Sequence, residues 1–163
     1  LFIPAFNPPH KSLNLDMSYH RFEMAKLAVK NNSKFEVSDI EFRRKGKSYT
    51  YLTIVELYKE FLVEGKINFL IGTDAFQYIE KWYETDKLKN LVKFIVCVRE
   101  DKFDISKYDY LKDKGYEFEF QPLPFEDISS TKLRDDIKLG KSISGYVAKE
   151  VEVYIKKNGL YID

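Results

Sequence analysis

The order of hydrophobic and polar residues along the chain predicts alternating strands and helices. Short apolar runs bounded by glycine, proline or asparagine predict strands, whereas apolar residues three or four positions apart predict helices. The predicted strands cover residues 1–4, 35–43, 67–72, 92–98 and 116–121. The predicted helices cover residues 19–31, a segment that begins at 50 or 53 and ends at 64, a segment containing Phe76, Ile79 and Trp82, and residues 86–90, 130–138 and 147–157.

Two of the predicted strands have distinctive patterns. The run 92–98 is the most continuously apolar, which predicts a strand buried on both faces. In 35–43 the apolar positions change parity between Val37 and Ile40, which predicts a bulge or a bend. The alternation of strands and helices predicts an α/β fold, with a mainly parallel sheet flanked by helices, in a single domain over residues 1–163.

Polar residues follow the predicted strands at the points where ligands bind in open α/β sheets. They are Asn7, His10 and Lys11, then Ser48, Tyr49 and Thr50, then Thr73 and Asp74, then Arg99, and finally residues 129–134. We expect these groups to converge on one edge of the sheet. Their cationic and hydroxyl side chains favour a phosphorylated ligand, and Asp74 could accept hydrogen bonds from its sugar hydroxyls.

The run Ile-Ser-Ser-Thr-Lys-Leu-Arg at residues 128–134 is the most informative of these segments. Its hydroxyl residues precede a predicted helix, and Arg134 follows one turn later. A helix start exposes unpaired N–H groups and the positive end of the helix dipole, so it attracts anions. Hydroxyl groups and a guanidinium at that place predict a phosphate site.

Each of these positions also has a structural interpretation that the sequence leaves open. The alternatives are a helix cap for Ser129, Ser130 and Asp74, core packing for Trp82, and an ion pair with a neighbouring carboxylate for Arg99. The chain has no G-x-x-x-x-G-K and no G-x-G-x-x-G pattern. Two histidines and one cysteine argue against a transition-metal centre, so we expect no protein-held metal.

Composition narrows the class of protein. Apolar residues make up 44% and aromatic residues 16% of the chain, which is typical of a folded globular protein. The 27 basic and 26 acidic residues leave a formal charge of +1, which argues against a nucleic-acid partner. No apolar run approaches the roughly 20 residues of a membrane helix, so we expect no membrane partner. Cys97 is the single cysteine, which suits the reducing cytoplasm.

Taken together, the motifs resemble those of bacterial nicotinate-mononucleotide adenylyltransferases, members of the nucleotidyltransferase superfamily. The matching segments occur in family order over nearly the whole chain. They are Asn7-Pro8-Pro9-His10-Lys11, Ser48-Tyr49-Thr50, Gly72-Thr73-Asp74 with Trp82 following, and the run at residues 128–134. The resemblance implies a Rossmann-like nucleotidyltransferase fold.

The resemblance also implies a reaction and a set of binding residues. The phosphate of nicotinate mononucleotide attacks the α-phosphorus of ATP, giving deamido-NAD and pyrophosphate in NAD biosynthesis, with Mg²⁺ on the phosphates and no covalent intermediate. Ser130, Thr131, Arg134 and Lys11 are then expected to bind ATP. Thr50, Asp74, Trp82, Tyr83 and Arg99 are expected at the mononucleotide, with Trp82 against the pyridine ring.

Two departures from the family pattern stand out. The family's Gly-x-Phe-x-Pro-x-His-x-Gly-His segment is absent from the printed residues, and the chain begins at Leu1 within a predicted strand. We expect that segment, with its strand, its helix and its catalytic histidines, to lie upstream of Leu1, and the printed chain alone to be nearly inactive. The second departure is Leu52, where the family usually has an acidic residue.

Other functions stay open from the sequence. The protein could prefer nicotinamide mononucleotide or use both mononucleotides. The two substrates differ only in that one has a carboxylate where the other has an amide. A non-catalytic nucleotide-binding remnant is a second class. Trp82 and the Pro-Pro-His-Lys loop disfavour a pantetheine-phosphate substrate. The sequence does not separate a monomer from a homo-oligomer.

Overall fold

The computed structural model describes residues 1–9, 12, 14–99, 103–124 and 128–162. They form two compact units, one made of Leu1–Lys47 with Asp127–Asp163 and the other of Ser48–Glu126. The first unit is therefore built from both ends of the chain and the second from its middle. Within the described ranges, no helix is both long and apolar enough to cross a membrane.

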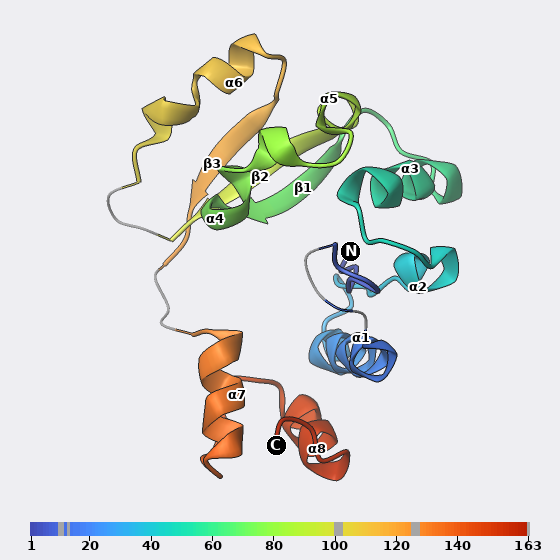
Figure 1. The fold of residues 1–163 in the computed structure, drawn as a ribbon, viewed down its shortest axis with the longest axis vertical. Coiled ribbons are helices and arrows are strands. Elements are labelled where there is room, and N and C mark those ends of the chain that lie inside the picture. The colour runs from blue at the N-terminus through green and yellow to red at the C-terminus, as the bar shows by residue number, and fades with distance from the viewer. Residues whose placement is uncertain (10–11, 13, 100–102, 125–127, 163) are drawn as a thin grey trace. The chain divides into compact units, whose positions relative to one another are not determined.

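The unit Ser48–Glu126 is organised around a parallel sheet, drawn in Figure 1. Its strands lie in the order β1 (Ile67–Gly72), β2 (Val92–Val98) and β3 (Phe118–Pro122). The register pairs Phe69 with Phe94 and Phe94 with Phe118. The predicted parallel α/β arrangement is confirmed here. The first two strands have their predicted bounds, and β3 begins at Phe118 rather than at residue 116.

One face of this sheet carries the core of the unit. Val92, Phe94 and Val96 of β2 are fully buried, whereas the residues between them are only half-buried. The prediction of a strand buried on both faces is therefore wrong, because the apolar run alternates in burial. The ring of Phe76, which is fully buried, packs 5.8 Å from Phe94 and 5.3 Å from Phe118 between ring centroids.

The helices of this unit are α3 (Thr50–Glu60), α4 (Thr73–Phe76), α5 (Thr85–Leu88) and α6 (Tyr110–Asp113), with 3₁₀ turns η1 (Ile79–Lys81) and η2 (Ile105–Tyr108). The helix predicted through Phe76 and Trp82 is broken into α4 and η1. Trp82 has extended backbone angles (φ −73°, ψ 149°), so the chain turns there. The elements η2 and α6 were not predicted, because segments this short show no period.

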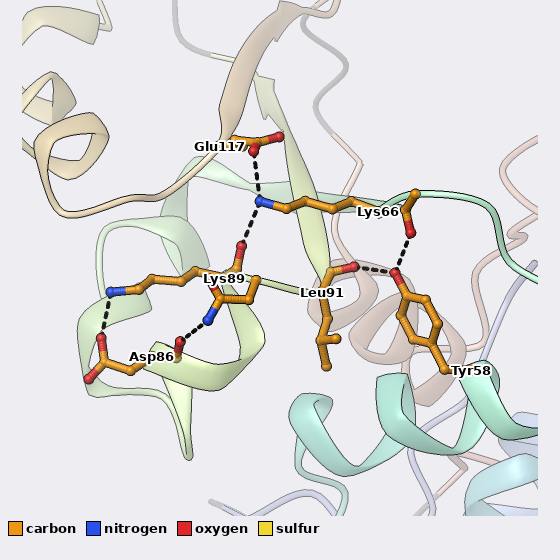
Figure 2. A network of polar contacts seen from close by, with 8 residues as sticks. Tyr58, Lys66, Asp86, Lys89, Leu91 and Glu117 are labelled. Carbon is orange, nitrogen blue, oxygen red and sulfur yellow. Dashed lines mark hydrogen bonds and ion pairs between the residues drawn. The ribbon is translucent and has the colours of Figure 1, made fainter.

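A polar network ties together the segments that lead into the three strands (Figure 2). The Lys66 ammonium donates to the Lys89 carbonyl oxygen at 3.2 Å and to Glu117 Oε1 at 2.7 Å. The Tyr58 hydroxyl lies 2.8 Å from the Leu91 carbonyl oxygen, to which it donates. Lys66, Leu91 and Glu117 each directly precede a strand, so the network joins the amino ends of all three.

The unit formed by the chain ends is helical. Its helices are α1 (Leu15–Val29), α2 (Ile40–Arg44), α7 (Ser130–Lys138) and α8 (Lys149–Lys157). Helix α1 begins before residue 19, where it was predicted, because Asn14 caps it by accepting from the Met17 N–H at 2.9 Å. The buried cluster Ile143, Val151, Ile155 and Leu160 packs against Met24 and Leu27 of α1.

Two strand predictions in this unit are wrong. Of residues 1–4 and 35–43, only Phe2 and Val37 form a bridge, and it is parallel. Ser38 accepts from the Ile40 N–H at 3.2 Å, and helix α2 begins there, with Asp39 paired to Arg43 one turn later at 2.8 Å. The change of parity in this segment therefore marks a switch from extended chain to helix.

Candidate active site

The first turn of α7 holds the hydroxyl and guanidinium groups that we predicted to bind phosphate. Ser129 precedes the helix in an extended conformation, and its Oγ accepts from the Lys132 N–H at 3.1 Å. Ser129 is therefore the cap. Arg134 donates from Nη2 to Thr131 Oγ1 at 3.2 Å. The side chains of Ser130, Thr131 and Arg134 are exposed at the helix end that attracts anions.

Tyr161 is an additional residue near this helix start. Burial raises the pKa of its phenol, while the positive charges of Arg134 and Arg21 lower it to a smaller extent. The ring also packs against the buried cluster of the unit. Tyr161 closes the segment 153–161, which also resembles the end of the family's sequences, but no sequence signal placed it near Arg134, which lies far along the chain.

The Gly72-Thr73-Asp74 segment links β1 to α4. Thr73 is buried and Asp74 is exposed in the first turn of α4, whose N-cap is Gly72. A Cβ atom on Gly72 would lie 2.5 Å from Asp74 Oδ1. Glycine is therefore required for the Asp74 carboxylate to fold back over the strand end. The structural alternative for Asp74, that it caps the helix, does not hold, since Gly72 has the cap position.

Aromatic rings gather around the predicted mononucleotide residues. Tyr83 is 46% exposed, and its ring stacks on Tyr49 with centroids 4.4 Å apart and an interplanar angle of 25°. Tyr49 directly precedes Thr50, the first residue of α3. Trp82 is half-buried, with its ring edge-on to Phe69 at 6.1 Å. Tyr83 therefore stacks on the residue that directly precedes Thr50.

Leu52 lies in the same helix, α3. It is half-buried, and the first turn of α3 has no acidic side chain. The N-cap Tyr49 has no side-chain capping bond. The start of α3 is thus stabilised less than a helix start with an acidic residue.

Arg99 follows β2 and is exposed. The register pairs Gly72 with Cys97, so the carboxyl ends of β1 and β2 lie next to each other. Thr73, Asp74 and Arg99 therefore follow neighbouring strands at the same edge of the sheet, as predicted. The ion-pair alternative for Arg99 involves Glu100 or Asp101, which lie outside the described residues.

The predicted residues divide between the two units. Ser130, Thr131 and Arg134 belong to the unit of the chain ends, and Thr50, Asp74, Trp82, Tyr83 and Arg99 belong to the unit of the sheet. His10 and Lys11 lie outside the described residues. Convergence of all the groups on one edge stays a prediction. In the part of the chain that the structure describes, no three His, Cys, Asp or Glu side chains form a group that could hold a metal ion.

Comparison with known proteins adds to this geometry. A family model described as cytidylyltransferase-like matches residues 1–136. A Clostridium botulinum protein named "Probable nicotinate-nucleotide adenylyltransferase" is 40% identical over 167 residues, covering 99% of this chain and 83% of its own length. A Staphylococcus epidermidis protein of the same name is 40% identical over 164 residues, covering 99% of this chain and 81% of its own.

Solved structures show the same fold. A Plasmodium falciparum nicotinic acid mononucleotide adenylyltransferase complexed with NaAD matches 98% of this chain and 80% of its own, with a TM-score of 0.71 and 24% identity. The same enzyme complexed with APC matches 88% of this chain and 75% of its own, with a TM-score of 0.62 and 25% identity. These matches confirm the Rossmann-like nucleotidyltransferase fold predicted from the sequence.

The relatives match nearly the whole of this chain and most of their own length, well beyond what a shared fold alone requires. The motif segments quoted above all lie within the matched span. The chain therefore belongs to the nicotinate-nucleotide adenylyltransferases.

Proposed function

We propose that this protein transfers the adenylyl group of ATP to nicotinate mononucleotide, with the binding residues named above. An oxygen of the mononucleotide phosphate forms a bond to the α-phosphorus, the bond from that phosphorus to the β-phosphate oxygen breaks, and pyrophosphate leaves. The observation that carries the proposal is the 40% identity to relatives of that name over 99% of the chain. Catalysis of this kind rests on positioning and on charge stabilisation.

The start of α7 is our proposed ATP phosphate site. The Lys132 N–H donates to Ser129 Oγ. The N–H groups of the first residues of a helix have no acceptor within the helix itself. Those of Ser130 and Thr131 are therefore suited to phosphate oxygens. The Arg134 guanidinium adds a fixed positive charge on the same turn, and Lys11 is proposed to assist from the Pro-Pro-His-Lys loop.

The sheet unit holds our proposed mononucleotide site. The Asp74 carboxylate accepts from ribose hydroxyls, and Thr50 donates from the start of α3. The ring of Trp82, fixed by its edge contact with Phe69, is proposed to lie against the pyridine ring, with Tyr83 beside it. Arg99, at the same sheet edge as Asp74, supplies positive charge for the mononucleotide.

Mg²⁺ belongs to this proposal as a partner of ATP. The described residues include no group of three metal-ligating side chains, whereas Mg²⁺ is commonly held by substrate phosphates with few protein ligands. We therefore propose that it binds as the MgATP complex. We also propose a cytoplasmic location, because the reaction consumes ATP.

The test is an adenylyl-transfer assay on the full-length protein with ATP, Mg²⁺ and either nicotinate or nicotinamide mononucleotide. The expected result is pyrophosphate release and deamido-NAD formation with nicotinate mononucleotide. A faster rate with nicotinamide mononucleotide would change the proposed substrate. A folded protein that binds ATP yet releases no pyrophosphate with either mononucleotide would refute the proposal and favour a nucleotide-binding remnant.

A further inference from the structure

Three side chains converge on the backbone of Ala5 and Phe6, just before the Asn7-Pro8-Pro9 segment. Glu41 Oε2 accepts from the Phe6 N–H at 3.1 Å. Ser18 Oγ donates to the Phe6 carbonyl oxygen at 2.7 Å. Arg21 Nη2 donates to the Ala5 carbonyl oxygen at 2.7 Å. Two consecutive residues are thus held by side chains from α1 and α2, where a strand ladder would otherwise supply the bonds.

The contacts at Phe6 are buried. Glu41 is 6% exposed, Ser18 is 1% exposed and Phe6 is 7% exposed. A buried carboxylate is costly unless its oxygens are paired or hydrogen-bonded. Here Oε2 takes the Phe6 N–H, and the Arg44 guanidinium lies 4.0 Å from Oε1. Burial of this kind makes the bonds strong and their geometry well defined.

The segment that follows needs such an external hold. Pro8 and Pro9 have no backbone N–H and cannot join a strand ladder. The Phe6 ring packs edge-on to Phe42, the neighbour of Glu41 on α2, with centroids 5.3 Å apart. Helix α2 therefore holds Phe6 by its main chain and by its ring, at the point where the Asn7 motif begins.

We propose that Glu41 and Ser18 are positioning residues for adenylyl transfer, acting through the backbone of Phe6 on the Asn7-Pro8-Pro9 segment. This inference rests on the proposed function, which assigns Lys11, in the motif that begins at Asn7, to the ATP phosphates. Neither side chain belongs to the motifs that carry the family resemblance. Loss of the anchor displaces the segment, and displacement of a binding group weakens the binding of its own ligand more than that of the mononucleotide.

The test compares Glu41→Ala, Glu41→Gln and Ser18→Ala with the full-length protein. In Glu41→Ala we expect KM for ATP to rise about tenfold, because a buried N–H loses its acceptor, while KM for nicotinate mononucleotide changes less than about twofold. Glu41→Gln keeps an acceptor oxygen and is expected to restore KM for ATP to within about twofold. Ser18→Ala, which removes a smaller group, carries the test if Glu41→Ala does not fold.

The control is Asp39→Asn, which removes a half-exposed carboxylate at the start of the same helix and is expected to leave both KM values unchanged. Partial unfolding lowers the active fraction and the apparent kcat but not KM, so KM separates positioning from stability. Unchanged KM for ATP in the folded variants would overturn the inference. A wild-type protein without adenylyl transfer would refute the proposed function instead.

Discussion

Arg134 and Thr131 are joined across one turn of α7, with the guanidinium Nη2 donating to the threonine Oγ1 at 3.2 Å. Both side chains are exposed, so this bond contributes little to stability. Its consequence is that a long, flexible side chain is ordered beside the helix start before any ligand arrives. Ordering of this kind lowers the entropy lost on binding a phosphate.

Replacement of Arg134 tests that role. We expect Arg134→Ala to lower kcat/KM about 100-fold, or about 2.7 kcal/mol of transition-state stabilisation, since the lost group interacts with charge that moves during transfer. The urea unfolding midpoint is expected to stay unchanged. Lys138→Ala, at the other end of the helix, is the matched control for charge. Activity equal to wild type in Arg134→Ala would remove α7 from the site.

Gly72 gives a test of Asp74 that leaves the Asp74 side chain in place. The backbone angles of Gly72 (φ −79°, ψ 158°) suit any residue, so alanine adds no backbone strain. Its Cβ would meet only the flexible carboxylate of Asp74. We therefore expect Gly72→Ala to fold with near-wild-type stability and to raise KM for the mononucleotide about tenfold. The measurements are steady-state kinetics and a thermal melt of the same preparation. A lowered melting temperature with an unchanged KM for the mononucleotide would contradict this prediction.

The stacked pair Tyr49 and Tyr83 gives a prediction about the mononucleotide pocket. Stacked aromatic pairs contribute about 0.5–1.5 kcal/mol beyond area burial. Tyr83→Phe preserves the stacking and is expected to keep KM for the mononucleotide within about twofold, whereas Tyr83→Ala raises it about tenfold. Tyr78→Ala removes another half-exposed tyrosine of the same unit and serves as control. Equal KM values in Tyr83→Ala and wild type would exclude the stack from the pocket.

The network at the amino ends of the strands is expected to affect stability and not activity. Lys66→Met removes the donor to the Lys89 carbonyl oxygen and to Glu117. Because Lys66 is about a quarter exposed, we expect the unfolding free energy to fall by about 1 kcal/mol. Lys93 is more exposed than Lys66, so Lys93→Met, which breaks the pair with Glu119, is expected to cost less than about 0.5 kcal/mol. A kinetic defect in Lys66→Met would show that the network also shapes the site.

The Glu80 carboxylate predicts a pH dependence of stability. The hydrogen bond from Lys114, and after it the one from Tyr110, holds the pKa of Glu80 below its ordinary value of 4.5. A carboxyl group with a lowered pKa in the folded state adds stability above its unfolded pKa, and this stability is lost as the pH falls through the folded pKa. The difference in unfolding free energy between wild type and Glu80→Gln should therefore be constant from pH 6 to 8 and shrink below pH 4.5. Urea unfolding across that pH range measures this difference. A difference in unfolding free energy that grew as the pH fell would contradict the prediction.

The strands of the sheet and helix α7 were predictable because each has a strong local signal. Runs such as Ile67–Gly72 are apolar and end at glycine, and α7 begins with residues that cap helices. Two strands were predicted where the structure has only the bridge between Phe2 and Val37. Local periodicity does not show that the extended chain ends at Ser38 and Asp39 and a helix begins. The alternating burial of β2 was not predicted either, because the strand has apolar residues on both of its faces.

The candidate site was predictable as a set of residues but not as a set of contacts. Thr131 and Arg134 are one turn apart, so their meeting followed from helical geometry. The stack of Tyr49 on Tyr83 and the approach of Tyr161 to Arg134 join distant parts of the chain. Such pairs depend on tertiary packing, which a single sequence does not display.

The division of the chain into an interrupted unit and a continuous one has a consequence for synthesis on the ribosome. The residues of the sheet unit, Ser48–Glu126, are consecutive in the chain and emerge from the ribosome one after another. Met24 and Leu27 of α1, in contrast, pack against the buried cluster that includes Ile155 and Leu160, which are made after the whole sheet unit. Since domains fold as units during synthesis, the apolar face of α1 stays exposed to solvent while the sheet unit folds. Helix α1 is thus made before the sheet unit but reaches its native packing after it.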